Sequence, residues 1–168
     1  MNKIHHSIQC LTIGIVTLLF VLASCSNDIV YQDAHAIDDT GWYKNDFVSF
    51  DYNATDTTGT YNILVDIRNT PDYPFQNFWL FVHSTSPKGI EFSDTLECML
   101  ADQYGRWIGK SSGSMYSVPV LFLSNIQFPQ EGTYHFDLVQ GMRADTLQGI
   151  HEIGIRIQKV TNDNDGKE

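Results

Sequence analysis

The chain has 168 residues, with 20 acidic and 10 basic side chains and a formal net charge of −10. Nucleic-acid binding needs clustered Lys and Arg to neutralise phosphates. The sequence contains no basic run, which excludes nucleic acid as a partner. The apolar fraction of 42% and the charged fraction of 18% exclude a disordered chain, and the length is sufficient for one domain.

The first residues have the pattern of a secretion signal. Residues 1–6 are polar, and an apolar run then extends from Leu11 to Ala23. The run has about 13 residues, whereas a membrane-spanning helix needs roughly 18–20, so its length is typical of a signal-peptide core. It ends in Leu22-Ala23-Ser24-Cys25, which resembles the lipobox of bacterial lipoproteins. We therefore expect residues 1–24 to be a cleaved lipoprotein signal peptide; an ordinary signal peptide with a chance cysteine is the alternative.

Cys25 is the expected lipid attachment site. In lipoproteins of this class the cysteine sulfur carries a diacylglyceryl group, a peptidase cuts before the cysteine, and its new amine is usually acylated. A single chain of about 14 carbons binds a membrane only marginally, whereas two or more chains hold it stably. Ser26 differs from the Asp that retains enteric lipoproteins at the inner membrane. The sequence thus predicts a permanent acyl anchor, with the outer membrane as the favoured location, on its periplasmic face or at the cell surface.

The other two cysteines carry no predicted chemistry. Cys10 leaves with the signal peptide, so Cys98 is the only remaining thiol in the body of the protein and has no partner for an internal disulfide. Cys98 alternates with Leu96 and Leu100 on one side of a period-two stretch. We expect it to be a small buried core residue.

Residues 25–45 are polar and rich in Asp, and we expect them to form the lipidated N-terminus and a flexible tether. A flexible coil of about 20 residues reaches roughly 25 Å. Residues 46–160 are the expected folded domain, and the polar residues 161–168 the expected flexible tail.

Period-two stretches between Gly, Pro, Asn and Asp turn signals recur in the folded domain and predict strands. The stretch 75–83 has apolar residues on both of its faces, so we expect other parts of the protein to cover both faces. Ile150, Ile153 and Ile157 also fit a helical stripe, but Gly154 and the isoleucine content favour a strand. About eight short strands predict an all-β fold, an antiparallel β-sandwich of the Ig-like or jelly-roll-like kind. The expected strands are 47–52, 61–67, 75–83, 95–101, 118–123, 134–138 and 153–157, with 107–108 after a turn.

The sequence contains no recognisable catalytic set, so we predict a protein that is not an enzyme, with no cofactor and no metal site. His83, His135 and His151 are far apart and lack metal-ligand spacing. Loop aromatics are the remaining candidates, because such rings stack on sugars or anchor protein partners; packing within the core or the loop is the alternative. The candidate binding surface comprises Tyr104, Arg106, Trp107 and Tyr116.

A set of short segments occurs in a fixed order along the chain: 61–69, 73–80, 94–96, 100–102, 105–109, 128–129, 132–134, 142–143 and 147–157. This ordered set resembles the gliding motility lipoprotein GldH family of Bacteroidetes. The resemblance covers nearly all of the chain after the signal peptide, and a lipobox is part of the family pattern. It implies a non-enzymatic envelope lipoprotein associated with the gliding machinery, which is linked to type IX secretion. The family has no established catalytic residues, so only the acyl site at Cys25 carries over.

The leading prediction is a lipid-anchored β-sandwich that docks to other envelope, gliding or secretion proteins. A glycan-binding module on the cell surface is the alternative, with Trp107, Tyr104 and Tyr116 as its stacking residues.

Overall fold

A computed structural model describes residues 28–161 of the protein. The predicted signal peptide and Cys25 lie outside the described residues. In the described part no helix is long and apolar enough to cross a membrane. The strands are β1 (Ile29–Ala36), β2 (Trp42–Tyr43), β3 (Val48–Ala54), β4 (Tyr61–Asn69), β5 (Asn77–Thr85), β6 (Glu91–Met99), β7 (Lys110–Ser112), β8 (Met115–Ile126), β9 (Gly132–Gln140), β10 (Thr146–Leu147) and β11 (Ile150–Lys159).

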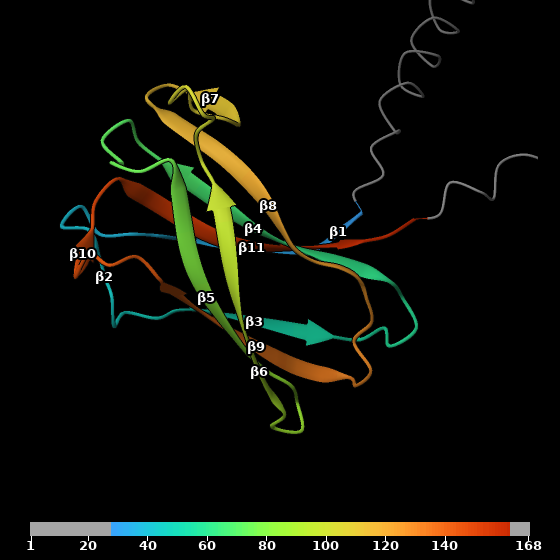
Figure 1. Ribbon diagram of the computed structural model, residues 1–168. Helices are drawn as coiled ribbons and strands as arrows, with labels where there is room; N and C mark the ends of the chain where they lie inside the picture. The colour runs from blue at the N-terminus through green and yellow to red at the C-terminus, as the bar shows by residue number, and fades with distance from the viewer. Residues whose placement is uncertain (1–27, 162–168) are drawn as a thin grey trace, which may run out of the picture.

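The strands form two packed antiparallel sheets, which confirms the predicted all-β sandwich (Figure 1). The five-stranded sheet has the order β1-β11-β4-β8-β7, and the four-stranded sheet the order β3-β9-β5-β6. The short strands β2 and β10 pair separately at one end of the sandwich. The ambiguous segment at the C-terminus is a strand, β11, which lies between β1 and β4 and buries its isoleucines in the core.

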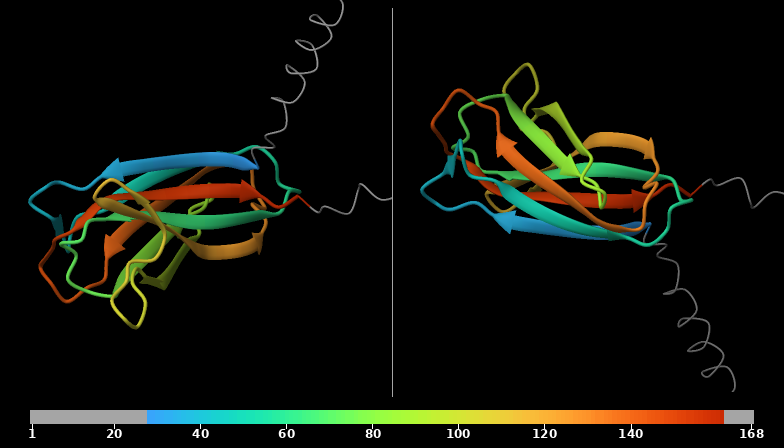
Figure 2. Two further views of the ribbon diagram at one scale, coloured as in Figure 1. Left: turned by 90° about the horizontal axis from the view of Figure 1, so that it is seen from above. Right: turned by 90° about the horizontal axis from the view of Figure 1, so that it is seen from below.

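The core lies between the sheets, because each long strand turns alternate side chains inward. On β5, Phe78, Leu80 and Val82 have no exposed surface. The expectation that the other face of this strand is also covered is wrong: Trp79 is 38% exposed and Phe81 42% exposed. No further layer of the described chain packs on that face (Figure 2). Sequence alternation cannot distinguish a covered apolar face from an open one.

The predicted tether is partly a strand. Residues 29–36 form β1, which pairs with β11 along the edge of the five-stranded sheet. The rings of Tyr31 and His35 pack on Tyr52 and Phe50 of the facing sheet, at centroid distances of 5.5 and 5.0 Å. The expected boundary at residue 46 is therefore wrong, because backbone pairing with β11 holds a segment whose side chains are mostly polar. The sandwich begins at Ile29.

Proline marks an open edge on β8. The strand extends from Met115 to Ile126, but β7 covers only residues 115–117. Pro119 therefore lies on the unpaired side beyond β7, where a missing N–H costs no ladder bond. The residues between β7 and β8 form a two-residue hairpin turn at Gly113 and Ser114, with Gly113 at φ 63°.

The two ends of the sandwich differ. Both termini of the described chain lie at one end, which we call the terminal end (Figure 2). There the Lys159 N–H donates a hydrogen bond to the Asp28 carbonyl at 2.7 Å. The loops 37–46, 70–76, 100–109 and 141–149 lie at the opposite end, which we call the distal end.

Candidate functional site

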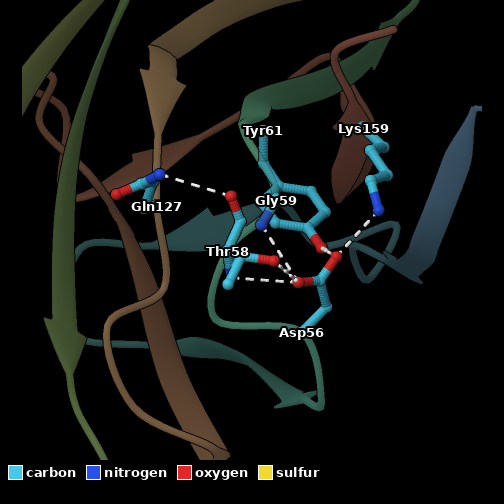
Figure 3. Close-up of polar contacts among 6 residues, drawn as sticks. All are labelled: Asp56, Thr58, Gly59, Tyr61, Gln127 and Lys159. Atoms are coloured by element: carbon cyan, nitrogen blue, oxygen red, sulfur yellow. Dashed lines mark hydrogen bonds and ion pairs between the residues drawn. The ribbon is translucent and has the colours of Figure 1, made fainter.

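At the terminal end, the carboxylate of Asp56 connects the loop before β4 to β11 (Figure 3). Asp56 accepts hydrogen bonds from the backbone N–H groups of Thr58 and Gly59, at 3.0 Å each, and from the Tyr61 hydroxyl at 3.0 Å. The Lys159 ammonium donates at 2.7 Å to Oδ2, the oxygen that also accepts from Tyr61, whereas the two N–H groups donate to Oδ1. Lys159 and the Thr58 N–H hold the pKa of the Asp56 carboxyl well below its usual range. The loop before β4 is thus fixed to the end of β11, next to the point where the chain continues toward Cys25.

The tyrosine in this cluster is buried and stays neutral. Burial, together with its hydrogen bond to Asp56, raises the pKa of Tyr61 to about 12. A neutral hydroxyl is needed here because it is the donor to the carboxylate. Gly59 completes the packing, since a Cβ at that position would lie 2.6 Å from the Tyr61 hydroxyl oxygen.

The predicted binding residues gather at the distal end. Trp107 lies 5.7 Å from Tyr116 and 6.5 Å from Tyr73, measured between ring centroids. The Arg106 guanidinium lies over the Tyr104 ring at 5.3 Å, which is a cation–π contact. We call the four residues Tyr104, Arg106, Trp107 and Tyr116 the distal loop surface.

The four residues have unequal exposure. Tyr104 is 75% exposed, as is the side chain of Arg106, while Trp107 and Tyr116 are half-buried. Trp107 therefore supports the loop from beneath, whereas Tyr104 and Arg106 are presented to solvent. The loop therefore does not present the exposed tryptophan ring face that sugar stacking would use.

Asp102 fixes the turn that presents these two residues. Its Oδ1 accepts the backbone N–H groups of Tyr104 and Arg106, at 2.9 and 3.0 Å. Its Oδ2 accepts both Nε and Nη2 of Arg106, each at 2.7 Å. Gly105 closes the turn at φ 75°, a conformation that glycine adopts without steric cost. The turn is preformed, so a partner would not need to order it.

Sequence reasoning missed the residue beneath this turn. Tyr73 is 3% exposed, donates its hydroxyl to the Asn77 carbonyl at 2.7 Å, and packs on Trp107 and Phe78. Burial raises the pKa of its hydroxyl far above the ordinary value. Gln140, which is 2% exposed, similarly fixes the loop 141–145 through the Met142 N–H and the Ala144 carbonyl. Both residues act through their burial, and burial could not be predicted because it depends on contacts between residues that are distant in sequence.

The groups with potential chemistry are separate in the structure. Cys98 is fully buried, as expected, and burial raises the pKa of its thiol to about 12, so it is not a nucleophile at neutral pH. His83 bonds to Ser93 at 2.8 Å and His135 pairs with Asp51, while His151 lies on β11. No group of three or more metal-ligating side chains occurs in residues 28–161.

Comparison with known proteins identifies the family. The sequence profile described as GldH lipoprotein matches residues 29–157. The chain belongs to the GldH lipoprotein family. It is 30% identical over 151 residues to a protein of Christiangramia forsetii named as a gliding motility lipoprotein GldH homolog, covering 86% of this chain and 92% of the relative. It is 29% identical over 154 residues to the gliding motility lipoprotein GldH of Flavobacterium johnsoniae, covering 87% and 95%.

Similarity to solved structures is weak. A GH115 4-O-methyl-α-glucuronidase aligns with a TM-score of 0.40 and 12% identity, over 82% of this chain and 18% of that one. An infectious bursal disease virus structure aligns with a TM-score of 0.38 and 12% identity, over 80% of this chain and 31% of that one. Similarity at this level says nothing about function.

The first testable consequence concerns the turn. We expect Asp102→Ala to speed amide exchange at Tyr104 and Arg106 several-fold, because it removes the acceptor of both N–H groups. The Arg106 N–H holds the pKa of Asp102 below its ordinary value, so the same loosening is expected in the unaltered protein only as pH falls through that lowered pKa. Exchange measured by mass spectrometry checks this.

The matched control is Asp145→Ala, which removes an exposed carboxylate paired with Lys44 at the same end. It should leave exchange in the 102–106 turn unchanged. Equal exchange in the Asp102→Ala and unaltered proteins would contradict the role of Asp102.

Proposed function

We propose that this protein is a lipid-anchored component of the gliding motility apparatus, linked to type IX secretion, that acts by binding other envelope proteins and performs no chemistry itself. The observation that carries the proposal is the GldH family match over residues 29–157, together with the names of the two relatives. The lipobox ending at Cys25 supports acylation there, and Ser26 supports delivery to the outer membrane.

The fold determines how such a protein would stand on its membrane. Only Ser26 and Asn27 separate Cys25 from Asp28, and three extended residues span about 10 Å at most. The terminal end would therefore lie next to the lipid headgroups, without the long tether that the sequence pattern suggested. Strands of nine or ten residues are about 30 Å long, so the distal loop surface would face away from the membrane at about that distance.

A binding role suits the exposed distal residues. Tyr and Arg are enriched among residues that dominate protein interfaces, and here both are held in a preformed turn. The sugar-binding alternative has less support, because Trp107 and Tyr116 are half-buried against each other.

The test is removal of the acyl site in cells. We expect Cys25→Ala to abolish both acylation and the cleavage before residue 25, because it removes the sulfur that carries the lipid. Other gliding or secretion components should then no longer be recovered with it from detergent-solubilised envelopes. Mass spectrometry of the unaltered protein should show a mature N-terminus at a lipid-modified Cys25.

Cys10→Ser is the control, since this cysteine lies in the segment that is cleaved and should leave both results unchanged. An unaltered protein that keeps Met1 or a bare Cys25 thiol would contradict lipid anchoring. Repeated recovery of the native protein alone at low salt would contradict the binding role.

A further inference from the structure

Strand β6 offers an unpaired edge of the four-stranded sheet. In the described chain β6 pairs only with β5, in a continuous register from Glu91 opposite Thr85 to Met99 opposite Asn77. The register has no bulge and the strand contains no proline. Natural proteins usually block such edges, because unpaired N–H and C=O groups can pair with another chain.

The other edges of the sandwich are interrupted or shorter. The open side of β8 contains Pro119, and its register with β4 shifts at two places. β1 has a register shift between Ile29 and Tyr31. The edge of β3 is also regular, but β3 has seven residues, against nine in β6. β6 is thus the longest edge with an unbroken register in residues 28–161.

Every second backbone N–H group of β6 points away from the sheet. The Thr95 N–H bonds to the carboxylate of its own neighbour, Asp94, at 2.7 Å. Because alternate residues of an edge strand share one N–H direction, the N–H groups of Ser93 and Glu97 point outward with it. An incoming strand would meet these outward N–H groups at every second residue, and pairing with Thr95 would replace its bond to the Asp94 carboxylate.

An apolar groove lies beside this edge, between the two sheets. It has a volume of about 280 Å³. Phe92 of β6 is 50% exposed at its rim, and Ile90 just before the strand is 63% exposed. The other apolar lining residues are Ile63, Leu123, Ile126, Phe128 and Phe136. Alternate side chains of an added strand would enter this groove, as in other cases of strand addition.

The negative charge of β6 favours a partner strand of opposite charge. β6 carries Glu91, Asp94 and Glu97 and has no Lys or Arg. A second copy pairing along the same edge would bring carboxylates against carboxylates, which is destabilising across a strand pair. A strand that carries Lys or Arg would instead be complementary.

We propose that the β6 edge binds an extended segment of another envelope protein, with alternating apolar side chains and at least one Lys or Arg, which adds to the four-stranded sheet as a fifth strand. The inference rests on the proposed function for the compartment in which the partner lies. It does not involve the distal loop surface, so one chain can engage two partners.

The experiment is site-specific photo-crosslinking of the full-length protein in its native cells. A photoreactive residue replaces Ser93 on β6, or Gln32 on the solvent-facing side of β1 as the position control. We expect an adduct from position 93 and none from position 32. Sequencing the crosslinked peptide should identify a segment with alternating apolar residues and a basic residue.

Proline and isosteric variants then test backbone pairing. Thr95→Pro should lower the adduct at least tenfold, because it removes an outward donor while the Thr95 N–H makes no bond to β5. Thr95→Val keeps the N–H and the β-branched shape, so its adduct should equal that of the unaltered protein. The double variant Glu91→Lys, Glu97→Lys should also lower the adduct, through charge repulsion.

Four results would overturn the inference. They are equal adducts from positions 93 and 32, an adduct that survives Thr95→Pro, an adduct with the mass of two copies, and a crosslinked peptide without a basic residue.

Thermal unfolding of Thr95→Pro shows whether the variant is folded. If it is not folded, the adduct of the Glu91→Lys, Glu97→Lys variant decides. Membrane fractionation of the same cells separates the two proposals. Release of the unaltered protein from membranes contradicts the proposed function, whereas membrane retention without a position-93 adduct contradicts the β6 inference alone.

Discussion

Gly149→Ala should destabilise the protein by about 2–5 kcal/mol, and the damage should reach the distal loop surface. Gly149 has φ 84°, a region that costs a residue with a Cβ about 1–2 kcal/mol. A Cβ there would also lie 2.4 Å from the Tyr73 backbone nitrogen and 2.5 Å from its Cα. Relieving that overlap costs about a further 1–3 kcal/mol. Tyr73 must shift, and Trp107 packs on it.

Denaturant unfolding of the detergent-solubilised protein measures the loss, and amide exchange at Trp107 measures the local effect. Gly105→Ala is the matched control, because Gly105 has φ 75° but a Cβ at that position would meet nothing within 4 Å. It should cost only the conformational part, about 1–2 kcal/mol. Equal losses for the two variants would show that the contact with Tyr73 is not limiting.

Phe78→Ala should destabilise the protein by about 3–5 kcal/mol, because it leaves a cavity in the centre of the core. Phe78 is fully buried on β5, and its ring lies 5.9 Å from Trp42 and 6.4 Å from Tyr73. Both neighbours support loops of the distal end. The loss is a large share of a typical domain stability of about 5–15 kcal/mol, so denaturant unfolding should detect it readily.

Phe81→Ala is the control for this prediction, since it removes the same side chain from the same strand on the opposite face. Phe81 is 42% exposed, so its truncation should cost about 1 kcal/mol or less. A loss as large as that of Phe78→Ala would mean that the outer face of β5 is covered in the native protein. The pair thus tests directly which of the two apolar faces of β5 forms the core.

The sequence predicted seven of the long strands because their side chains alternate with period two. On β4, for example, Tyr61, Ile63, Val65 and Ile67 are all buried, and the residues between them are not. β1 gave no such signal, since six of its eight residues are exposed and pairing with β11 holds it in place. Its backbone bonds depend on a partner more than 100 residues away, which no local pattern records.

The candidate site was likewise predicted from the sequence only in part. Tyr104, Arg106, Trp107 and Tyr116 could be selected from sequence as loop aromatics and a neighbouring cation. Which of them face solvent could not, because exposure depends on Tyr73 beneath Trp107 and on the carboxylate of Asp102.

The sequence by itself determined the all-β class, the family and the expected acyl site, since alternation, short motifs and a lipobox are local properties of the chain. Tertiary structure alone decided that the sandwich begins at Ile29, which face of β5 is buried, and that β6 is left unpaired. These features depend on which strands become neighbours, and strand neighbours are chosen by contacts across the whole sandwich.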